Sequence, residues 1–435
     1  MKKVLLIADT YYPDSRATIQ IAQRIAEELV KRGYTVEALP LHMENRKQLV
    51  YPASHNGVSI LKLSDYDLSE EEQFILQKKM NQLCYRVALA PKKFLIKDPG
   101  HYGEKWNEML LRFVRKVRKE VYEKPQKNIF LCEYTERMRK CIRSTVPDLV
   151  ISVALPFDIH YCMSKAIAGT PIKWIATGFD PYAFEQLLDK TESKRRLAQE
   201  YRVYKNAAAV LLLSQFQNDY AREKLREKIR FVELPNIRPL QPSVKPEKRF
   251  FDENDINCAF IGNLYGVKRN PSFIFDFFEK MTDENIHLYV IGSLIDISPE
   301  DIEQYSRKMN GRLHYLGRVG QQEAIDAMFE ADVLVNVGHT TSNQCPSKVL
   351  DYMSTGKPIL HIAKRDTCSS LPYLVNYEDW ICVEEKAGLR DDVIRDVQAF
   401  ILNSKGKKRI PFEHVREALP NCTIEKYVDT IERSL

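Results

Sequence analysis

The amino-acid sequence predicts an α/β protein with two Rossmann-like, doubly wound domains, at 1–237 and 256–412. The chain opens with a short apolar strand, a loop, a helix closed by Gly33 and a second strand, which is how a doubly wound sheet begins. The second half repeats this style, and three of its expected strands run directly into a glycine. Between the halves, the start of 238–255 combines three prolines with little apolar content, so we expect a linker there.

Each expected element of the first domain has a local signal. Apolar runs predict strands at 3–8, 35–39, 148–153, 172–176, 209–213 and 231–234. Helices are expected at 18–32, 158–168 and 214–228, with another ending at 200–206. The stretch of about 68–141 is mostly helical in pattern and basic. It is therefore predicted to be an elaboration inserted into this domain.

The second half gives the same kind of pattern. Strands are expected at 256–261, 287–291, 313–316, 333–337 and 359–362, and helices at 271–281, 321–329 and 348–353. A late helical segment follows within 413–435. The glycines that end three strands, Gly262, Gly292 and Gly317, indicate tight turns or a close approach of the backbone to a ligand. Ligands of such sheets bind beyond the carboxyl ends of the strands, so the early loop Asp9–Ala17 is a further candidate for a site wall.

Composition is typical of a globular enzyme. The 435 residues are too many for one core, and 44% of them are hydrophobic and 29% charged. The longest apolar run, 207–213, is far too short to span a membrane, and the first residues indicate a strand and not a secretory signal. Nine cysteines without a CxxC pair favour a reducing cytoplasm over a zinc site or a disulfide framework.

The surplus of positive charge is concentrated in one segment. Residues 91–127 contain eleven basic and five acidic side chains, a surplus of six that equals the net charge of the whole chain. Apolar residues recur at helical spacing through the same stretch. One interpretation is a basic amphipathic helix on an anionic membrane surface; the other is a helix packed on its own domain with a solvated basic face. A nucleic-acid partner is not expected, because no nucleic-acid-binding motif accompanies the charge.

The stretch from Asn343 to Leu360 carries the strongest local signal for function. Pro346 and Ser347 can start a helix that ends near Gly356. Unpaired N–H groups and partial positive charge make such a helix start a phosphate site, which Lys348 would strengthen. Asp351, one turn further on, is placed to accept a ribose hydroxyl. An ordinary connection between helix and strand remains the alternative.

This stretch resembles the donor-binding motif of retaining glycosyltransferases of the GT-B fold, the family-4-like group. That motif has an acidic residue, seven others, a Glu, and then A-x-G-x-P. Asp351 stands at the second acidic place, and Gly356 and Pro358 match the tail of the motif. The first acidic place is Asn343, which leaves the sugar and the stereochemistry open.

The resemblance extends into the first domain. Tyr11–Pro13 and Gly33–Val36 are similar to the family's opening, but the two family glycines are absent and Arg16 lies in their region. Arg16 is expected either to bind a phosphate or to anchor the loop. The segments ending at Ser152 and at Asp180–Tyr182 resemble a subgroup of the family. Ser152 is therefore an acceptor-side candidate and Asp180 a candidate to bind or deprotonate an acceptor hydroxyl, with capping of a turn as the alternative.

The second domain supplies the implied donor site. Lys268 and Arg269, after the first strand of this half, are expected to bind the leaving diphosphate, with plain surface solvation as the alternative. The loop around Arg318 resembles the family's base-reading loop. The donor-binding residues implied by the resemblance are Gly262, Asn263, Gly292, Gly317, Arg318, Val319, Asn343, Pro346, Ser347, Lys348 and Asp351.

The resemblance implies two domains facing a cleft, with the C-terminal helix crossing back to the first domain. It also implies transfer of a sugar from a nucleoside-diphosphate sugar to a saccharide or lipid-linked saccharide, as in surface polysaccharide assembly, with retention expected. No cofactor or metal is expected. The predicted location is cytoplasmic, with possible peripheral contact with the inner face of the membrane.

Two other functions fit the same fold. A nucleotide-sugar epimerase would need acidic and His groups at the cleft that the pattern does not supply. A non-catalytic nucleotide-binding scaffold would account for Asn343 and for the absence of the family's His near Ser152. His160, on the next helix, is not assigned that role.

Overall fold

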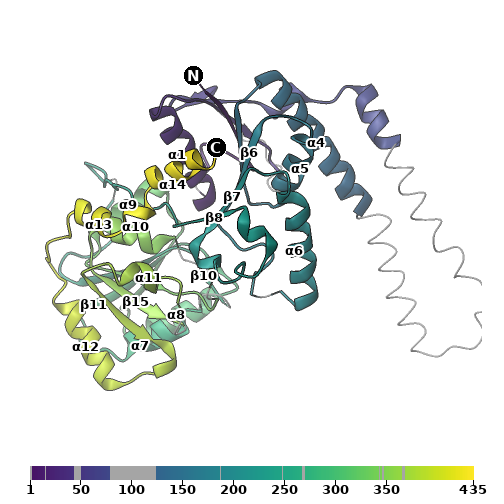
Figure 1. Ribbon diagram of the computed structural model, residues 1–435. Helices are drawn as coiled ribbons and strands as arrows, with labels where there is room; N and C mark the ends of the chain where they lie inside the picture. The colour runs from purple at the N-terminus through teal and green to yellow at the C-terminus, as the bar shows by residue number, and fades with distance from the viewer. Residues whose placement is uncertain are drawn as a thin grey trace, which may run out of the picture. The chain divides into compact units, whose positions relative to one another are not determined.

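The computed structural model describes residues 2–14, 16–43, 50–78, 124–186, 188–246, 248–266, 270–341, 343–344, 347–364 and 368–435 (Figure 1). The chain divides into two compact units. One holds residues 1–178, 198–210 and 435, and the other holds 179–197 and 211–434. The domain limits predicted at 237, 255 and 412 stay predictions.

The first sheet has eight strands in the order β3-β4-β2-β1-β5-β6-β7-β8. Their bounds are β1 Lys3–Ala8, β2 Thr35–Pro40, β3 Ser54–His55, β4 Val58–Ile60, β5 Leu149–Val153, β6 Lys173–Gly178, β7 Ala209–Leu213 and β8 Ile229–Val232. Strand β1 pairs in parallel with both β2 and β5. The chain therefore winds outward from β1 toward both edges of the sheet, as in a doubly wound sheet. The winding reverses between β1 and β5.

Helices of this part of the chain follow from the apolar pattern. They are α1 Ala17–Lys31, α4 Lys124–Thr145, α5 Asp158–Ala166 and α6 Lys190–Tyr204. In α1, Ile21, Ile25 and Leu29 recur every four residues and are all buried, which places one face of the helix on the core. The helix is followed by Gly33, whose φ of 85° suits the chain reversal there.

One sequence prediction for this part is wrong, and another concerns residues that the structure does not describe. The helix expected at 214–228 is wrong: the chain forms two short 3-10 turns, η4 Ser214–Phe216 and η5 Lys224–Glu227. Asn218 and Asp219 lie between them, and their side chains favour turns over helix interiors. Of the predicted elaboration, 79–123 lies outside the described residues.

The second sheet has six strands in the order β13-β11-β9-β14-β15-β16. Their bounds are β9 Ile256–Ile261, β11 Ile286–Ile291, β13 Leu313–Gly317, β14 Val333–Val337, β15 Ile359–Ala363 and β16 Trp380–Glu384. All the pairings are parallel. In chain order this is the 3-2-1-4-5-6 arrangement of a doubly wound sheet, and the winding reverses between β9 and β14. Two short strands, β10 Leu264–Tyr265 and β12 Leu294–Ile295, pair separately.

Helices cover this sheet and bury its side chains. They are α7 Ser272–Glu279, α8 Pro299–Lys308, α9 Gln321–Glu330, α10 Lys348–Thr355, α11 Leu371–Leu374 and α12 Asp391–Leu402, with the turn η6 Glu385–Ala387. Every residue of β9 is buried, as expected for a parallel strand covered on both faces. Phe275, Phe277 and Phe278 of α7 pack in the same apolar core. Strand β16 and helices α8 and α12 were not among the sequence predictions.

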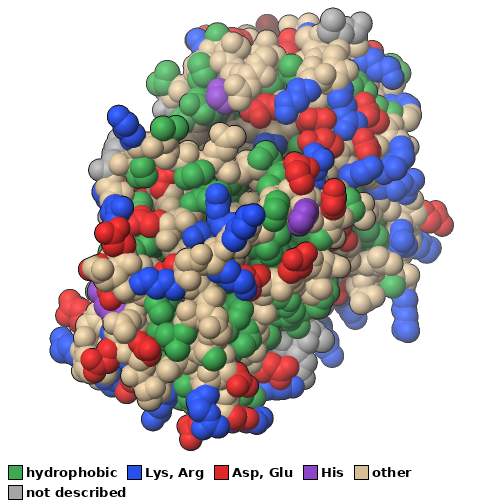
Figure 2. Space-filling model, turned by 90° about the vertical axis from the view of Figure 1, so that its left-hand side faces the viewer, with side chains coloured by type: hydrophobic (Ala, Val, Ile, Leu, Met, Phe, Trp, Pro, Cys, Tyr) green, Lys and Arg blue, Asp and Glu red, His purple; other side chains and the backbone are tan. Residues whose placement is uncertain are grey.

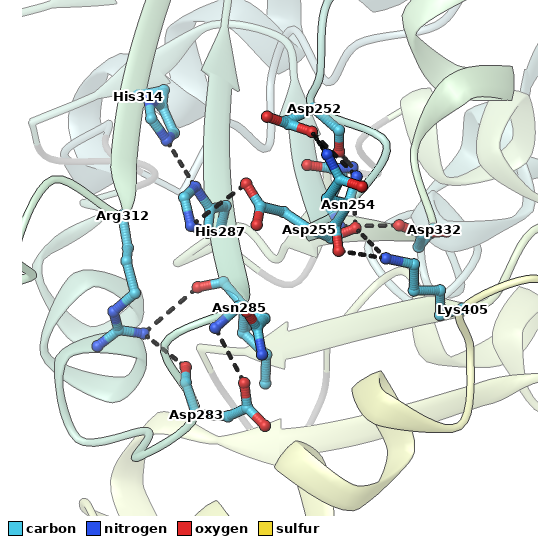
Figure 3. A network of polar contacts seen from close by, with 12 residues as sticks. Asp252, Asn254, Asp255, Asp283, Asn285, His287, Arg312, His314, Asp332 and Lys405 are labelled. Carbon is cyan, nitrogen blue, oxygen red and sulfur yellow. Dashed lines mark hydrogen bonds and ion pairs between the residues drawn. The ribbon is translucent and has the colours of Figure 1, made fainter.

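The amino ends of these strands are tied together by polar contacts (Figure 3). Nδ1 of His287 on β11 lies 2.9 Å from Nε2 of His314 on β13, and Nε2 of His287 lies 3.6 Å from a carboxylate oxygen of Asp255. Burial, and then the neighbouring His287, lower the pKa of His314. Lys405 donates to the carbonyl of Asp255 at 3.0 Å. These contacts lie at the edge of the sheet opposite to the one where ligands bind.

The C-terminal segment is helical, as predicted. It forms α13 Phe412–Ala418, the turn η7 Pro420–Cys422 and α14 Ile424–Arg433. The Thr423 hydroxyl accepts a hydrogen bond from the Lys426 N–H and caps α14. Helix α14 lies beside β8, the last strand of the first sheet (Figure 1).

The surface gives no sign of a membrane-spanning element in the described part of the chain. None of the described helices combines the length and apolar character needed to cross a bilayer. On the face shown in Figure 2, basic and acidic side chains are interspersed.

Candidate functional site

The second sheet offers a ligand position where its winding reverses. Strands β9 and β14 are neighbours, but the chain leaves them toward opposite edges of the sheet. Such a reversal marks the usual ligand position at the carboxyl edge of a doubly wound sheet, and the connections 262–270 and 338–347 follow these two strands. Lys268, Arg269 and Pro346 belong to these connections and lie outside the described residues.

Helix α10 begins at Lys348, after the second of these connections and where the sequence predicted a helix start. Ser347 precedes its first residue and makes no side-chain capping hydrogen bond. The first N–H groups of a helix have no partner within the helix, so this start can hold an anion. At the other end, Gly356 takes a left-handed φ of 73°. A Cβ on Gly356 would lie 2.1 Å from the carbonyl oxygen of Ile410, so only glycine fits.

A buried tyrosine fixes α10 against β9. The hydroxyl of Tyr352 accepts the N–H of Ile261 at 2.8 Å and donates to the carbonyl of Ile261 at 3.0 Å. Tyr352 is buried, so both bonds form away from solvent and are costly to lose. The contact sets the helix start relative to the Gly262 turn.

Asp351 lies at the centre of a charged cluster on the first turn of α10. One carboxylate oxygen accepts from Asn236 at 3.0 Å and from the Arg238 guanidinium at 3.0 Å. The other lies 3.4 Å from Nζ of Lys348. Asn236 also donates to the carbonyl of Ser347 at 3.0 Å. Two cations around one carboxylate leave a net positive charge at the helix start, which favours a phosphate.

Asn343, at the first acidic place of the motif, is buried, and its side-chain amide makes only part of its possible hydrogen bonds. Its Nδ2 donates to the carbonyl of Phe184 at 2.7 Å and to the carboxylate of Asp219 at 3.2 Å. Its Oδ1 is buried and has no hydrogen-bond partner among the described residues. Burial raises the pKa of Asp219, while the bond from Asn343 opposes that rise. An amide therefore suits this position, because it donates to Asp219 where a carboxylate would repel it.

The glycine turns after β9, β11 and β13 stack on one another. The N–H of Gly262 donates to the carbonyl of Ile291, and the N–H of Gly292 donates to the carbonyl of Gly317, both at 2.8 Å. Gly292 has a φ of 148°, and a Cβ there would lie 1.9 Å from the carbonyl oxygen of Gly262. The carboxyl edge thus brings these predicted residues together with Asn263, whose side chain accepts from Ser293 at 3.3 Å. Beyond β13, Arg318 is exposed and Val319 is half-buried.

In the first sheet, Arg16 anchors the loop at the β1–β5 reversal. Its Nη2 donates to Asp9 at 2.9 Å and to the Thr10 hydroxyl at 2.8 Å, and its Nε donates to Asp14 at 2.9 Å. Burial opposes the charge on Arg16, but its hydrogen bonds to Asp14 and Asp9 raise the pKa. These partners favour loop anchoring over phosphate binding.

Two other predicted residues of this half differ in exposure. Ser152 is fully buried, and its hydroxyl accepts from Trp174 Nε1 and contacts His160 Nδ1, both at 2.8 Å, which favours a structural role. Burial lowers the pKa of His160 to about 3. Asp180 is half-buried and follows β6 after one residue, at the carboxyl end of that strand. Its role, like that of Ser152, stays a prediction.

The comparisons with known proteins concern the fold. No family model and no curated protein matches the chain. Among solved structures, TarM matches with a TM-score of 0.60 at 10% identity, covering 100% of this chain and 98% of TarM. HepE of Anabaena in complex with UDP matches with a TM-score of 0.56 at 10% identity, covering 100% of both chains. The lipopolysaccharide outer core galactosyltransferase WaaB in its apo form matches with a TM-score of 0.52 at 14% identity, covering 100% of this chain and 99% of WaaB.

The chain has the GT-B fold. This confirms the predicted fold class of two Rossmann-like, doubly wound α/β sheets. Within the GT-B fold, the described part of the implied donor site gathers at the carboxyl edge of the second sheet and at the start of α10.

Sequence reasoning missed three residues of this site. Asn236 and Arg238 bind Asp351, and Asp219 binds Asn343. The available signal for the first two was a polar pair shortly after the expected strand 231–234, in Pro235–Arg238. Asp219 lay inside the stretch that was wrongly predicted as a helix, which hid it as a site residue.

Proposed function

We propose that the chain is a glycosyltransferase that binds a nucleoside-diphosphate sugar at the carboxyl edge of its second sheet. The observation that carries this proposal is the start of α10, which has no side-chain cap and is flanked by Lys348 and Arg238. A diphosphate fits such a helix start. In further support, HepE, a structure with the same fold, was solved with UDP and with UDP-glucose.

The proposed reaction breaks the bond between the sugar's anomeric carbon and the diphosphate oxygen. The electron pair of that bond stays on the diphosphate, whose charge Lys348, Arg238 and the N–H groups of α10 stabilise. The predicted contacts of Lys268 and Arg269 add to this. The acceptor hydroxyl forms the new bond to the anomeric carbon and loses its proton, for which Asp180 is the proposed base. The scheme assigns all of this charge to protein groups and needs no metal.

The finer parts of the function are proposals of the same kind. A saccharide or lipid-linked saccharide is the proposed acceptor, in bacterial surface polysaccharide assembly on the cytoplasmic side of the membrane. Retention is the expected stereochemistry. Asn343 stands where the motif has its first acidic residue, so retention has to be tested directly. The measurement is the anomeric configuration of the product.

The test is release of nucleoside diphosphate from UDP-, GDP- and ADP-sugars, with and without glycolipid extract as acceptor. We expect release from one of these donors and a loss of about ten-fold or more in Lys348→Ala, because that variant loses a cation at the leaving group. Lys308→Ala, an exposed lysine on α8, is the matched control. Binding without release would support the scaffold alternative. Conversion of the donor to its epimer without transfer would support the epimerase.

A further inference from the structure

One cavity of the structure has a lining that is rich in arginine. A cavity of about 490 Å³ is lined by Gln217, Arg226, Ile229, Arg230, Phe231, Thr430, Arg433 and Ser434. These residues come from η5, β8 and the end of α14, together with the turn after η4. Three of the lining residues are arginines and none is acidic. None of the eight belongs to the donor site described above.

The three guanidinium groups are held by neutral partners. Arg226 lies with its guanidinium carbon 4.8 Å from the centre of the Phe231 ring. Arg230 donates to the carbonyl of Glu227 at 2.9 Å, and Arg433 donates to the Thr430 hydroxyl at 3.1 Å. Each contact orients a guanidinium without neutralising it. Most of the five N–H donors of each arginine stay available for a ligand.

The charge of the cavity has no acidic partner among the described residues. Within the described part of the chain, no carboxylate forms an ion pair with Arg226, Arg230 or Arg433, whereas many of the other arginines do form such pairs. Three like charges around one cavity repel each other. An anion with several oxygens removes this repulsion, and guanidinium groups bind phosphate oxygens in pairs.

We propose that this cavity binds the phosphate group of a ligand other than the donor nucleotide. The arginines supply the bidentate contacts to the phosphate, and the side-chain amide of Gln217 supplies a further donor. Ile229 and Phe231 form an apolar side for the part of the ligand that carries the phosphate. The phosphate belongs either to a phospholipid headgroup or to a soluble phosphate ester, and the proposal stands independently of the glycosyltransferase activity.

The first arm of the test measures binding of inorganic phosphate by calorimetry, in the full chain carrying Lys348→Ala so that the donor site contributes little. The cavity variant combines Arg226→Gln, Arg230→Gln and Arg433→Gln. The control combines Arg307→Gln, Arg395→Gln and Arg416→Gln, three exposed arginines elsewhere, and has the same net charge. We expect at least ten-fold weaker phosphate binding in the cavity variant and unchanged binding in the control.

The second arm measures co-sedimentation with vesicles of phosphatidylcholine alone or mixed with phosphatidylglycerol. Binding to the mixed vesicles that is lost only in the cavity variant assigns the site to a lipid headgroup. Phosphate binding without vesicle binding assigns it to a soluble phosphate ester. No phosphate binding by the parent chain, or equal losses in the cavity and control variants, overturns the proposal. If the triple variant has a lowered melting temperature, Arg433→Gln alone replaces it, with an expected loss of about three-fold.

Discussion

At the scale of single residues, Asn343 shows how a motif position adapts to its surroundings. Its amide donates to Asp219, a carboxylate whose pKa is already raised by burial. A Glu at this position would put a second carboxylate beside the first, and two neighbouring carboxylates do not both ionise without cost. Asn343 therefore differs from the acidic residue of the motif that the sequence resembles, and the acidic group beside it in this chain is Asp219, to which its amide donates.

This leads to a prediction for Asn343→Glu compared with the neutral Asn343→Gln. The carboxyl group added by Glu, or that of Asp219, will have a raised pKa in the folded state, so the folded state loses stability as pH rises through that pKa. In urea unfolding at pH 8, we expect the unfolding free energy of Asn343→Glu to be about 1–3 kcal/mol lower than that of Asn343→Gln. The difference should shrink at pH 5. An equal difference at both pH values would contradict the account.

At the scale of elements, α10 depends on the backbone of the glycine that follows its last residue. Gly356 combines a φ of 73° with a Cβ position 2.1 Å from the Ile410 carbonyl oxygen. Gly406 has a φ of 69° and no atom near its Cβ position, so it is a matched control. We expect Gly406→Ala to cost about 1–2 kcal/mol for the left-handed conformation alone. Gly356→Ala should cost a further 1–3 kcal/mol or so from overpacking, measured as unfolding free energy in urea; equal costs would contradict the close approach.

Strand β15 carries a buried histidine that makes stability depend on pH. Burial lowers the pKa of His361 to about 4. Its Nδ1 lies 2.8 Å from Nδ2 of Asn336, and its Nε2 lies 3.3 Å from Sγ of Cys368. Because the unfolded chain binds this proton near pH 6.5, the unfolding free energy falls as pH falls from about 6.5 to about 4, by roughly 1.4 kcal/mol per pH unit.

The variant His361→Gln removes this titration. In urea unfolding followed between pH 7 and pH 4.5, we expect its stability to depend less steeply on pH than that of the wild type. His414→Gln changes an exposed histidine on α13 and should keep the wild-type slope. If the unfolding free energy of His361→Gln depended on pH as steeply as that of the wild type, His361 would not be the source of the loss of stability in acid.

At the scale of the whole molecule, the segment predicted as a linker is fastened to one unit. Asp326 on α9 accepts the N–H of Ser243 at 2.7 Å and its hydroxyl at 2.8 Å. Glu330 accepts the N–H groups of Phe250 and Phe251 at 3.1–3.2 Å. The low apolar content near 239–246 predicted a linker, and no helix or strand forms there. It did not reveal these side-chain anchors, because they form between segments far apart in the sequence.

The sequence predicted the doubly wound sheets because strands, glycine turns and amphipathic helices are local features. It placed α10 and the glycine turns after β9, β11 and β13 correctly for the same reason. The partners of Asp351 were not predictable in this way, since Asn236 and Asp351 are 115 positions apart. Short-range patterns also favoured a helix at 214–228, where the chain forms two 3-10 turns separated by Asn218 and Asp219, residue types that favour turns.

The most direct test of the donor site is a thermal-shift screen with UDP, GDP, ADP and CMP and their sugar conjugates. A ligand that binds only the folded state raises the melting temperature by mass action. We predict that one nucleoside diphosphate stabilises the wild type and Lys308→Ala, and stabilises Lys348→Ala and Arg238→Gln much less. No shift with any of these nucleotides, or equal shifts in all four proteins, would contradict a donor site at the start of α10.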